Sequence, residues 1–245
     1  MARYQVILSY DGTDFLGFQR QSDGRTVQGA VEHALHQIGW RDQSVLAAGR
    51  TDAGVHASGQ VIAFDLNWAH SRFDLQRALN ANLPDDVAVK AVGIADESFH
   101  PRYDAKARLY QYQIFIEESR NPLKERYAWR VWPELSLDLM LAGTRQITGT
   151  HDFASFGSPL KPGGSTIRTI FEANWNRAAL DYTFIIQGNA FLYRMVRRII
   201  FFMVQIGRGD IDPESVPDWL KDGKTPVQGL APSCGLNLVE VIYPH

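Results

Sequence analysis

The sequence is organised around residues 49–56, Gly-Arg-Thr-Asp-Ala-Gly-Val-His, where two glycines, a hydroxyl group and a charged pair stand between two strand-like runs. Residues 45–48 before this octet are short and apolar, and residues 60–65 after it alternate as a half-buried strand does. The octet is therefore predicted to connect neighbouring strands. A loop held in this way can present a side chain rigidly.

Within the octet, Arg50 and Asp52 place a permanent forked cation, suited to phosphate, beside a carboxylate that should stay ionised. Gly49, Gly54 and Gly59 are expected to permit positive φ or the close approach of a ligand. This combination suits an active-site loop with Asp52 as a nucleophile. The alternative is an Asx-type turn in which Asp52 caps backbone amides and pairs with Arg50.

Working outward, hydrophobic periodicity predicts strands and helices that alternate on both sides of the octet. The predicted elements of the first half are strand 3–10, helix 27–38, strands 45–48 and 60–65, helix 73–83 and strand 87–94. Those of the second half are strand 107–116, helix 136–147, strands 166–175 and 180–187, helices 191–206 and 213–221, and strand 236–243. The first half follows the order β-α-β-β-α-β, which is typical of the ferredoxin-like (RRM-like) unit, and the second half repeats this order with insertions.

The predicted fold is therefore α+β, with two ferredoxin-like halves that share a mainly antiparallel sheet. We expect helices on one face of the sheet and a central cleft where the halves meet, a common location for sites. Residues 99–105 are polar and aromatic without periodicity and are interpreted as the linker. The expected domains are residues 1–105, which carry the octet, and residues 106–245.

The composition predicts a soluble globular protein of the cytoplasm. The longest unbroken apolar run, residues 199–204, is far shorter than a bilayer requires, and no apolar signal segment begins the chain. The single cysteine, Cys234, excludes an internal disulfide and a cysteine-based metal cage. His33 and His36 lie one helical turn apart without a third ligand nearby, so no metal site is expected.

The charge is uneven, although the net charge is only −2. Seven cations lie between Lys161 and Arg208 against two acids, and 19 of the chain's 25 cations are Arg, which suits phosphate forks and base stacking. A local basic face for a polyanion is therefore plausible, with ordinary solvated charge as the alternative.

Three further segments carry candidate binding side chains. In the loop 13–21, Phe18 and Arg20 suit base stacking and phosphate contact, although phenylalanines under a long loop also form satellite cores. The strand 107–116 places Arg108 and Tyr110 on one face. The predicted helix 191–206 spaces three arginines at i, i+3 and i+4, which makes a stripe on one helical face. These arginines are Arg194, Arg197 and Arg198.

The octet resembles the catalytic signature of the tRNA pseudouridine synthases of the TruA family. By this resemblance, Asp52 is the catalytic carboxylate and Arg50 its neighbour in the site. Arg108-Leu109-Tyr110 matches the family's Arg-x-Tyr motif, whose Tyr stacks on the target uracil and is a candidate proton acceptor. Arg197 matches the cation paired with the carboxylate, and residues 231–238 resemble the family's Ala-Pro...Gly-Leu-x-Leu ending, so the resemblance covers nearly the whole chain.

The resemblance implies a homodimer that converts uridine to pseudouridine in the anticodon stem-loop of tRNA. The reaction breaks the N1–C1′ bond and rejoins the uracil through C5 without redox or net hydrolysis, so no cofactor is expected. Asp52 could attack C1′ or C6, or stabilise charge at C1′, with a glycal route also open. Tyr110 or a water could remove the final proton.

Two other classes stay open from the residues alone. A non-catalytic RRM-like RNA-binding protein would explain the fold and the basic stripe, but it would not need Arg50 and Asp52 in a glycine-bounded loop. A nucleosidase or glycosylase could also use Asp52, but such enzymes usually need a second acid, and neither the octet nor the Tyr110 strand supplies one.

Overall fold

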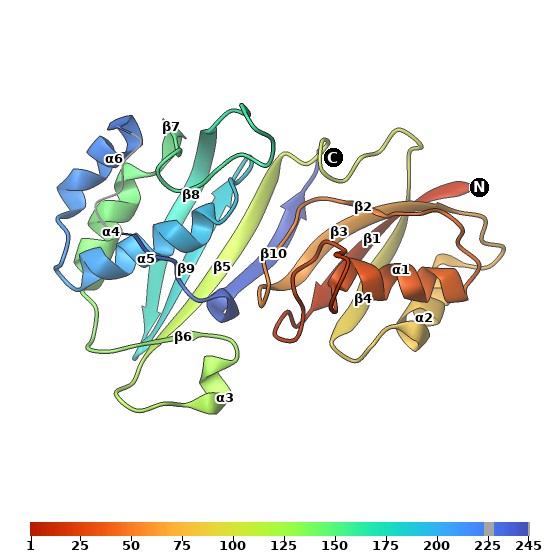
Figure 1. Ribbon diagram of the computed structural model, residues 1–245, viewed down its shortest axis with the longest axis horizontal. Coiled ribbons are helices and arrows are strands. Elements are labelled where there is room, and N and C mark those ends of the chain that lie inside the picture. The colour runs from red at the N-terminus through yellow and green to blue at the C-terminus, as the bar shows by residue number, and fades with distance from the viewer. Residues whose placement is uncertain (223–227, 245) are drawn as a thin grey trace. The chain divides into compact units, whose positions relative to one another are not determined.

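The computed structural model describes residues 1–222 and 228–244, and the chain has the predicted α+β composition (Figure 1). It divides into two compact units, which are Met1–Lys106 with Asn237–His245, and Ala107–Leu236. The first boundary lies one residue from the expected one. The closing segment groups with the first unit, whereas the sequence had placed it in the second half.

The first unit is built on an antiparallel sheet of strand order β4-β1-β3. Its elements are β1 (Ala2–Tyr10), α1 (Val27–Gln37), β2 (Leu46–Ala47), β3 (His56–Leu66), α2 (Arg72–Asn82), β4 (Val87–Ala95) and the late strand β10 (Leu236–Ile242). The short strand β2 pairs antiparallel with β3, and β10 runs parallel to the start of β3. The order β4-β1-β3-β2 is that of the predicted ferredoxin-like unit.

Local signals fix where the two helices of this unit begin. The Thr26 hydroxyl accepts the backbone N–H of Gly29 and caps α1. Ser71 and Asp74 form a reciprocal capping box at the start of α2. The helices lie against each other (Figure 1), and alternate residues of β1 are buried while those between them are half-exposed. One face of the sheet is therefore covered.

The second unit is built on a sheet of order β5-β9-β8-β7, antiparallel at each step. Its strands are β5 (Ala107–Ile116), β6 (Trp129–Val131), β7 (Gly149–Asp152), β8 (Ile167–Ala178) and β9 (Asp181–Gly188). Its helices are α3 (Pro122–Glu125), α4 (Leu137–Gln146), α5 (Met195–Gly207), α6 (Val216–Asp222) and the 3-10 turns η1 (Pro213–Ser215) and η2 (Ser233–Gly235). The strand β6 pairs parallel with β5.

The core of the second unit lies between this sheet and the apolar helices. The indole N–H of Trp175 on β8 donates to the Thr144 hydroxyl on α4 at 3.1 Å, and its ring lies 4.7 Å from that of Phe184 on β9. Helix α5 packs along α4 (Figure 1). Although α5 is strongly apolar, no helix in the described part of the chain is long and apolar enough to cross a membrane.

The start of α5 differs from the predicted helix 191–206. The helix begins at Met195, because Arg194 adopts a left-handed conformation with φ 63°. Tyr193 before it donates its backbone N–H to the carbonyl of Ser158, so this segment pairs with a loop rather than with a helical turn. The prediction that Arg194 lies on a helical face is therefore wrong.

Candidate active site

The octet forms the connection between β2 and β3 in the first unit, as predicted, although β3 begins within it at His56. Thr51 is buried, and its hydroxyl shares a hydrogen bond of 2.8 Å with that of Tyr10 at the end of β1. Its carbonyl accepts the backbone N–H of Phe18 at 3.1 Å. Asp52 follows this anchored residue and is half-exposed, so a fixed backbone presents a carboxylate that solvent and ligands can reach.

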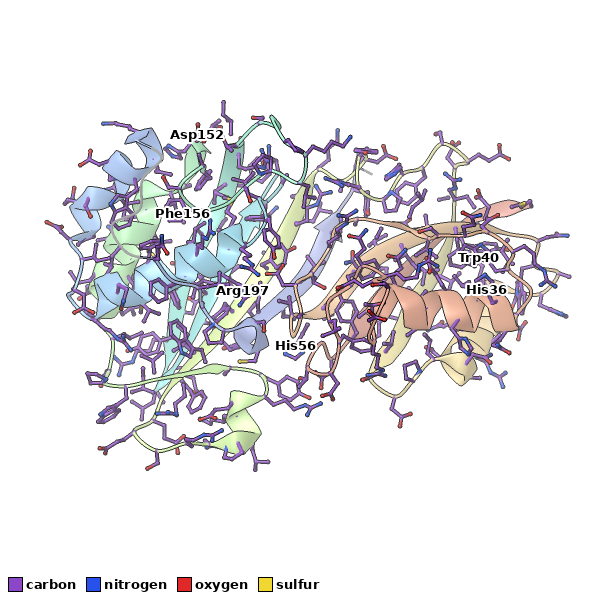
Figure 2. The ribbon with its side chains drawn as sticks, viewed as in Figure 1. His36, Trp40, His56, Asp152, Phe156 and Arg197 are labelled. Carbon is purple, nitrogen blue, oxygen red and sulfur yellow. The ribbon has the colours of Figure 1, made fainter. Side chains whose placement is uncertain are left out.

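His56 secures the far end of the octet, as its place at the start of β3 shows (Figure 2). The imidazole is mostly buried, and its Nδ1 accepts the backbone N–H of Gly12 at 3.0 Å. The Asp11 carboxylate lies 3.2 Å from the same ring nitrogen, so two neighbours just after the end of β1 hold the imidazole. His56 is a supporting residue that sequence reasoning missed, although it closes the quoted motif.

Two glycines outside the octet allow the preceding loop to press against it. A Cβ on Gly12 would lie 2.0 Å from the carbonyl oxygen of Val55. Gly17 has φ 101°, and a Cβ there would lie 2.8 Å from the Thr51 carbonyl oxygen. Of the glycines expected to allow a positive φ or a ligand, Gly54 has φ 76°, as predicted. Gly59 instead lies against the Val239 carbonyl of its own chain, where a Cβ would approach the oxygen to 2.1 Å.

Gly49 differs from that expectation. Its φ is not left-handed, and a Cβ there would meet no atom within 4 Å among the described residues. Arg50 beside it is exposed, and its side chain forms no hydrogen bond or ion pair within residues 1–222 and 228–244. The alternative in which Arg50 pairs with Asp52 is therefore not the arrangement found.

The loop 13–21 buries one of its two predicted binding side chains and exposes the other. Phe18 is only 2 % exposed, so the expectation of an exposed ring for stacking is wrong, and the satellite-core alternative describes it. The ring packs beside Tyr10, with 6.3 Å between centroids, because the backbone of Phe18 is bonded to Thr51 and faces the core. Arg20 is exposed and pairs with Glu32 at 2.8 Å.

In the second unit, β5 places Arg108 and Tyr110 against the segment that precedes α5. The Arg108 guanidinium donates to the Asn189 carbonyl at 2.8 Å, and only 9 % of the residue is exposed. Tyr110 is half-buried, with its ring perpendicular to that of Phe191 at 5.2 Å. Arg108 and Tyr110, predicted on one face of the strand, thus both contact the segment that precedes α5.

Arg197 lies in the first turn of α5 (Figure 2) and is hydrogen-bonded to Ala231, which follows α6 in the chain. Its Nε donates to the Ala231 carbonyl at 2.8 Å, and the Ala231 N–H returns a bond of 3.2 Å to the Arg197 carbonyl. Arg198 is half-buried beside it. Arg194, outside the helix, is exposed and lies with its guanidinium 4.8 Å from the Tyr193 ring centroid.

Tyr112 is a supporting residue of the second unit that sequence reasoning left unassigned. It is fully buried, and its hydroxyl donates to the Pro232 carbonyl at 2.8 Å. Burial raises the pKa of this phenol well above its ordinary value of 10.0, so it remains a donor. Gly235 permits the approach, because a Cβ there would lie 2.6 Å from the Tyr112 ring. Tyr112 thereby fixes the segment that holds Arg197.

A family model described as tRNA pseudouridine synthase matches residues 6–104 and 144–244. The chain belongs to this family. Members of the tRNA pseudouridine synthase family are isomerases that act on uridine in tRNA, and the predicted enzyme class is confirmed. The matched ranges contain the octet and Arg197, whereas Arg108 and Tyr110 lie between them.

Similar proteins cover 99 % of the chain. The tRNA pseudouridine synthase A of Thermotoga sp. (strain RQ2) is 41 % identical over 99 % of this chain and 100 % of its own. That of Geobacillus sp. (strain WCH70) is 42 % identical over 99 % of each. A crystal structure of a Cbf5-Nop10-Gar1 complex has a TM-score of 0.37 and 10 % identity, over 82 % of this chain and 45 % of that one. This last similarity is too low to support an argument.

Proposed function

We propose that this chain, a tRNA pseudouridine synthase by family, isomerises uridines in the anticodon stem-loop of tRNA and uses Asp52 as its catalytic carboxylate. One observation carries the proposal: Asp52 is half-exposed on a backbone that the buried Thr51, with bonds to Tyr10 and Phe18, holds in place. Precise positioning of a reacting group is worth several orders of magnitude in rate. We further propose that the protein acts as a homodimer in the cytoplasm.

In the proposed reaction, the N1–C1′ bond of uridine breaks, the uracil turns, and a C5–C1′ bond forms; C5 loses its proton and N1 takes one up, so the product is an isomer of uridine. Asp52 supplies negative charge at C1′ or C6 during bond cleavage. Tyr110 stacks on the turned uracil and accepts the proton directly or through water. The target base must first leave its stack, which costs a few kcal/mol.

We assign Arg197 to the same reaction as the cation that keeps the Asp52 carboxylate ionised and oriented. This assignment is supported by the two hydrogen bonds between Arg197 and Ala231, of which the bond from Nε restrains the guanidinium group. Arg50, Arg194 and Arg198 are assigned to phosphate contact, because an exposed or half-exposed guanidinium suits the RNA backbone. Arg108 contributes by holding the Asn189 carbonyl.

The test is nucleoside analysis of an unmodified tRNA transcript, and of the isolated anticodon stem-loop, after incubation with the protein alone. Both should gain pseudouridine. Asp52→Asn should bind the transcript normally but lose about a thousandfold or more in single-turnover rate, because the change is isosteric and removes only the charge. The matched control is Asp42→Asn, an exposed aspartate of the same unit, which should react at the wild-type rate. A rate above a few per cent for Asp52→Asn would reject Asp52 as the catalytic group.

A further inference from the structure

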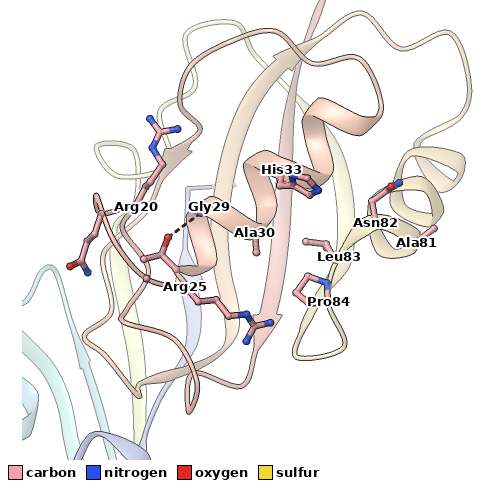
Figure 3. A pocket seen from close by; sticks show the side chains of 12 residues that line it. Arg20, Arg25, Gly29, Ala30, His33, Ala81, Asn82, Leu83 and Pro84 are labelled. Carbon is pink, nitrogen blue, oxygen red and sulfur yellow. Dashed lines mark hydrogen bonds between the residues drawn. The ribbon is translucent and has the colours of Figure 1, made fainter.

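A groove of about 570 Å³ lies in the first unit between the start of α1 and the end of α2 (Figure 3). Arg20 and Arg25 reach it from the loop before α1, and His33 from α1 itself. Asn82 and Pro84 close it from the end of α2. The groove does not contain the octet, so the proposed chemistry leaves it without a function.

Both arginines of the groove are the more exposed members of their ion pairs. The Arg20 side chain is 52 % exposed and that of its partner Glu32 only 3 %. The Arg25 side chain is 42 % exposed and that of its partner Asp86 23 %. A ligand in the groove therefore meets guanidinium groups first, and these are donors suited to phosphate.

The orientation of Arg20 is fixed by a buried polar network around Glu32 and Gln28. One oxygen of Glu32 accepts from Arg20, and the other accepts from the Gln28 amide at 2.8 Å and the Val45 N–H at 3.1 Å. The side-chain amide oxygen of Gln28, Oε1, in turn accepts the Arg20 backbone N–H at 3.0 Å. Burying a carboxylate in this way is costly unless its partners are well placed. The network holds one guanidinium in a set orientation.

Arg25 offers a flat surface instead. Its guanidinium carbon lies 4.1 Å from the centre of the Phe15 ring, which covers one face. Both terminal nitrogens donate to the Asp86 carboxylate, one of them at 2.7 Å, so the plane is clamped along its edge. The Arg25 side chain nevertheless stays 42 % exposed. Bases of unpaired RNA stack on such guanidinium planes.

The groove is connected to the octet by backbone hydrogen bonds of one loop. Phe18 donates its N–H to the Thr51 carbonyl, and its own carbonyl accepts the N–H of Gln28 in α1. Gly54 donates its N–H to the Phe15 carbonyl, and the next residue, Leu16, donates its N–H to the Arg25 carbonyl. The residues that hold Asp52 therefore also hold the groove.

We propose that this groove binds an unpaired nucleotide of the tRNA, with its phosphate on Arg20 and its base stacked on Arg25. The inference rests on the proposed tRNA substrate and adds a contact outside the reacting site. The binding energy of this contact would help to keep the RNA in place while the target uridine leaves its stack. The groove contributes to tRNA affinity and does not change the rate of the chemical step.

The test compares tRNA affinity over a salt series with single-turnover rates at saturating enzyme. Arg20→Gln is combined with Glu32→Gln, so that the buried carboxylate is not left unpaired. This double variant should lower the salt slope by about one unit, because one phosphate contact is lost. Arg25→Lys keeps the charge but loses the plane, and should weaken binding roughly tenfold with an unchanged slope. Saturated rates should equal those of the wild type.

The matched control is Arg72→Gln, an exposed arginine of α2 outside the groove, which should leave affinity and slope unchanged. Groove variants that keep the wild-type melting temperature and tRNA affinity would overturn the inference, as would an equal loss in the control. Groove-dependent binding of uridine monophosphate with unchanged tRNA affinity would overturn it in favour of a small-molecule site. A wild-type protein that forms no pseudouridine would reject the proposed function itself, a result distinct from these.

Discussion

At the scale of single residues, removing the Tyr110 hydroxyl distinguishes the two proposed roles of this residue, base stacking and proton acceptance. Tyr110→Phe keeps the aromatic surface against Phe191, so tRNA affinity should be within about twofold of the wild type. Loss of the proposed proton acceptor should slow single turnover by about a hundredfold or more. Rates over a pH series, beside binding at each pH, provide the measurement. An unchanged rate would leave Tyr110 with stacking alone.

Arg197 and Arg198 form a matched pair, because they are adjacent in the first turn of α5 and both are half-buried. Arg197→Gln should reduce the saturated rate and leave the salt slope of tRNA binding nearly unchanged. Arg198→Gln should do the reverse, with a slope smaller by about one unit. Arg194→Gln should behave as Arg198→Gln does. Weaker binding with a normal saturated rate in Arg197→Gln would show that the two roles are exchanged.

At the scale of elements, the octet depends on the loop that presses against it. Gly12→Ala would place a methyl group 2.0 Å from the Val55 carbonyl oxygen, so one of the two segments must shift. A displacement of about 1 Å at a catalytic group can cost about a hundredfold in rate, and we expect a loss of that size. Circular dichroism checks that the fold is kept.

Gly49→Ala is the control within the octet itself, because a Cβ at Gly49 has space and the backbone is not left-handed. It should react at nearly the wild-type rate. If Gly49→Ala were as slow as Gly12→Ala, steric crowding of the octet would not explain the loss of rate. Contact between Gly49 and the RNA backbone would then be the better explanation.

At the scale of the whole molecule, stability at acid pH should depend on the ion pair of Arg3 and Asp65 between β1 and β3. Their hydrogen bonds of 2.8 and 2.6 Å lower the pKa of Asp65 below its ordinary 3.8. A lowered pKa stabilises the fold above pH 3.8 and loses this effect as the pH falls through the folded-state value. Because the pair is partly exposed, the effect should be about 1 kcal/mol or less.

Asp65→Asn tests this by urea unfolding at pH 7 and at pH 3. The variant should be less stable than the wild type at pH 7. The difference should shrink at pH 3, because this pH lies below the ordinary pKa of 3.8 and the unfolded chain then binds a proton at Asp65 that the folded pair resists. Asp42→Asn serves again as the control. A difference of the same size at both pH values would mean that packing, and not charge, accounts for the loss.

The sequence by itself determined the elements in which hydrophobic periodicity continues over many residues and ends at a clear capping or stop signal. Helices α1 and α2 and strands β1, β4 and β5 lie within one or two residues of their predicted bounds, because caps and hydrophobic periodicity are local. It also determined the position of the octet between two strands, and the family resemblance drawn from it was confirmed by the comparisons.

Only the tertiary structure decided what each side chain contacts. Phe18 is buried because its backbone bonds to Thr51, and Arg194 is left-handed where its segment pairs with Ser158. The parallel pairing of Asn237 with His56 joins residues that are far apart in the chain. These features arise from contacts between distant segments, and such contacts leave no periodic signal around the residues that make them.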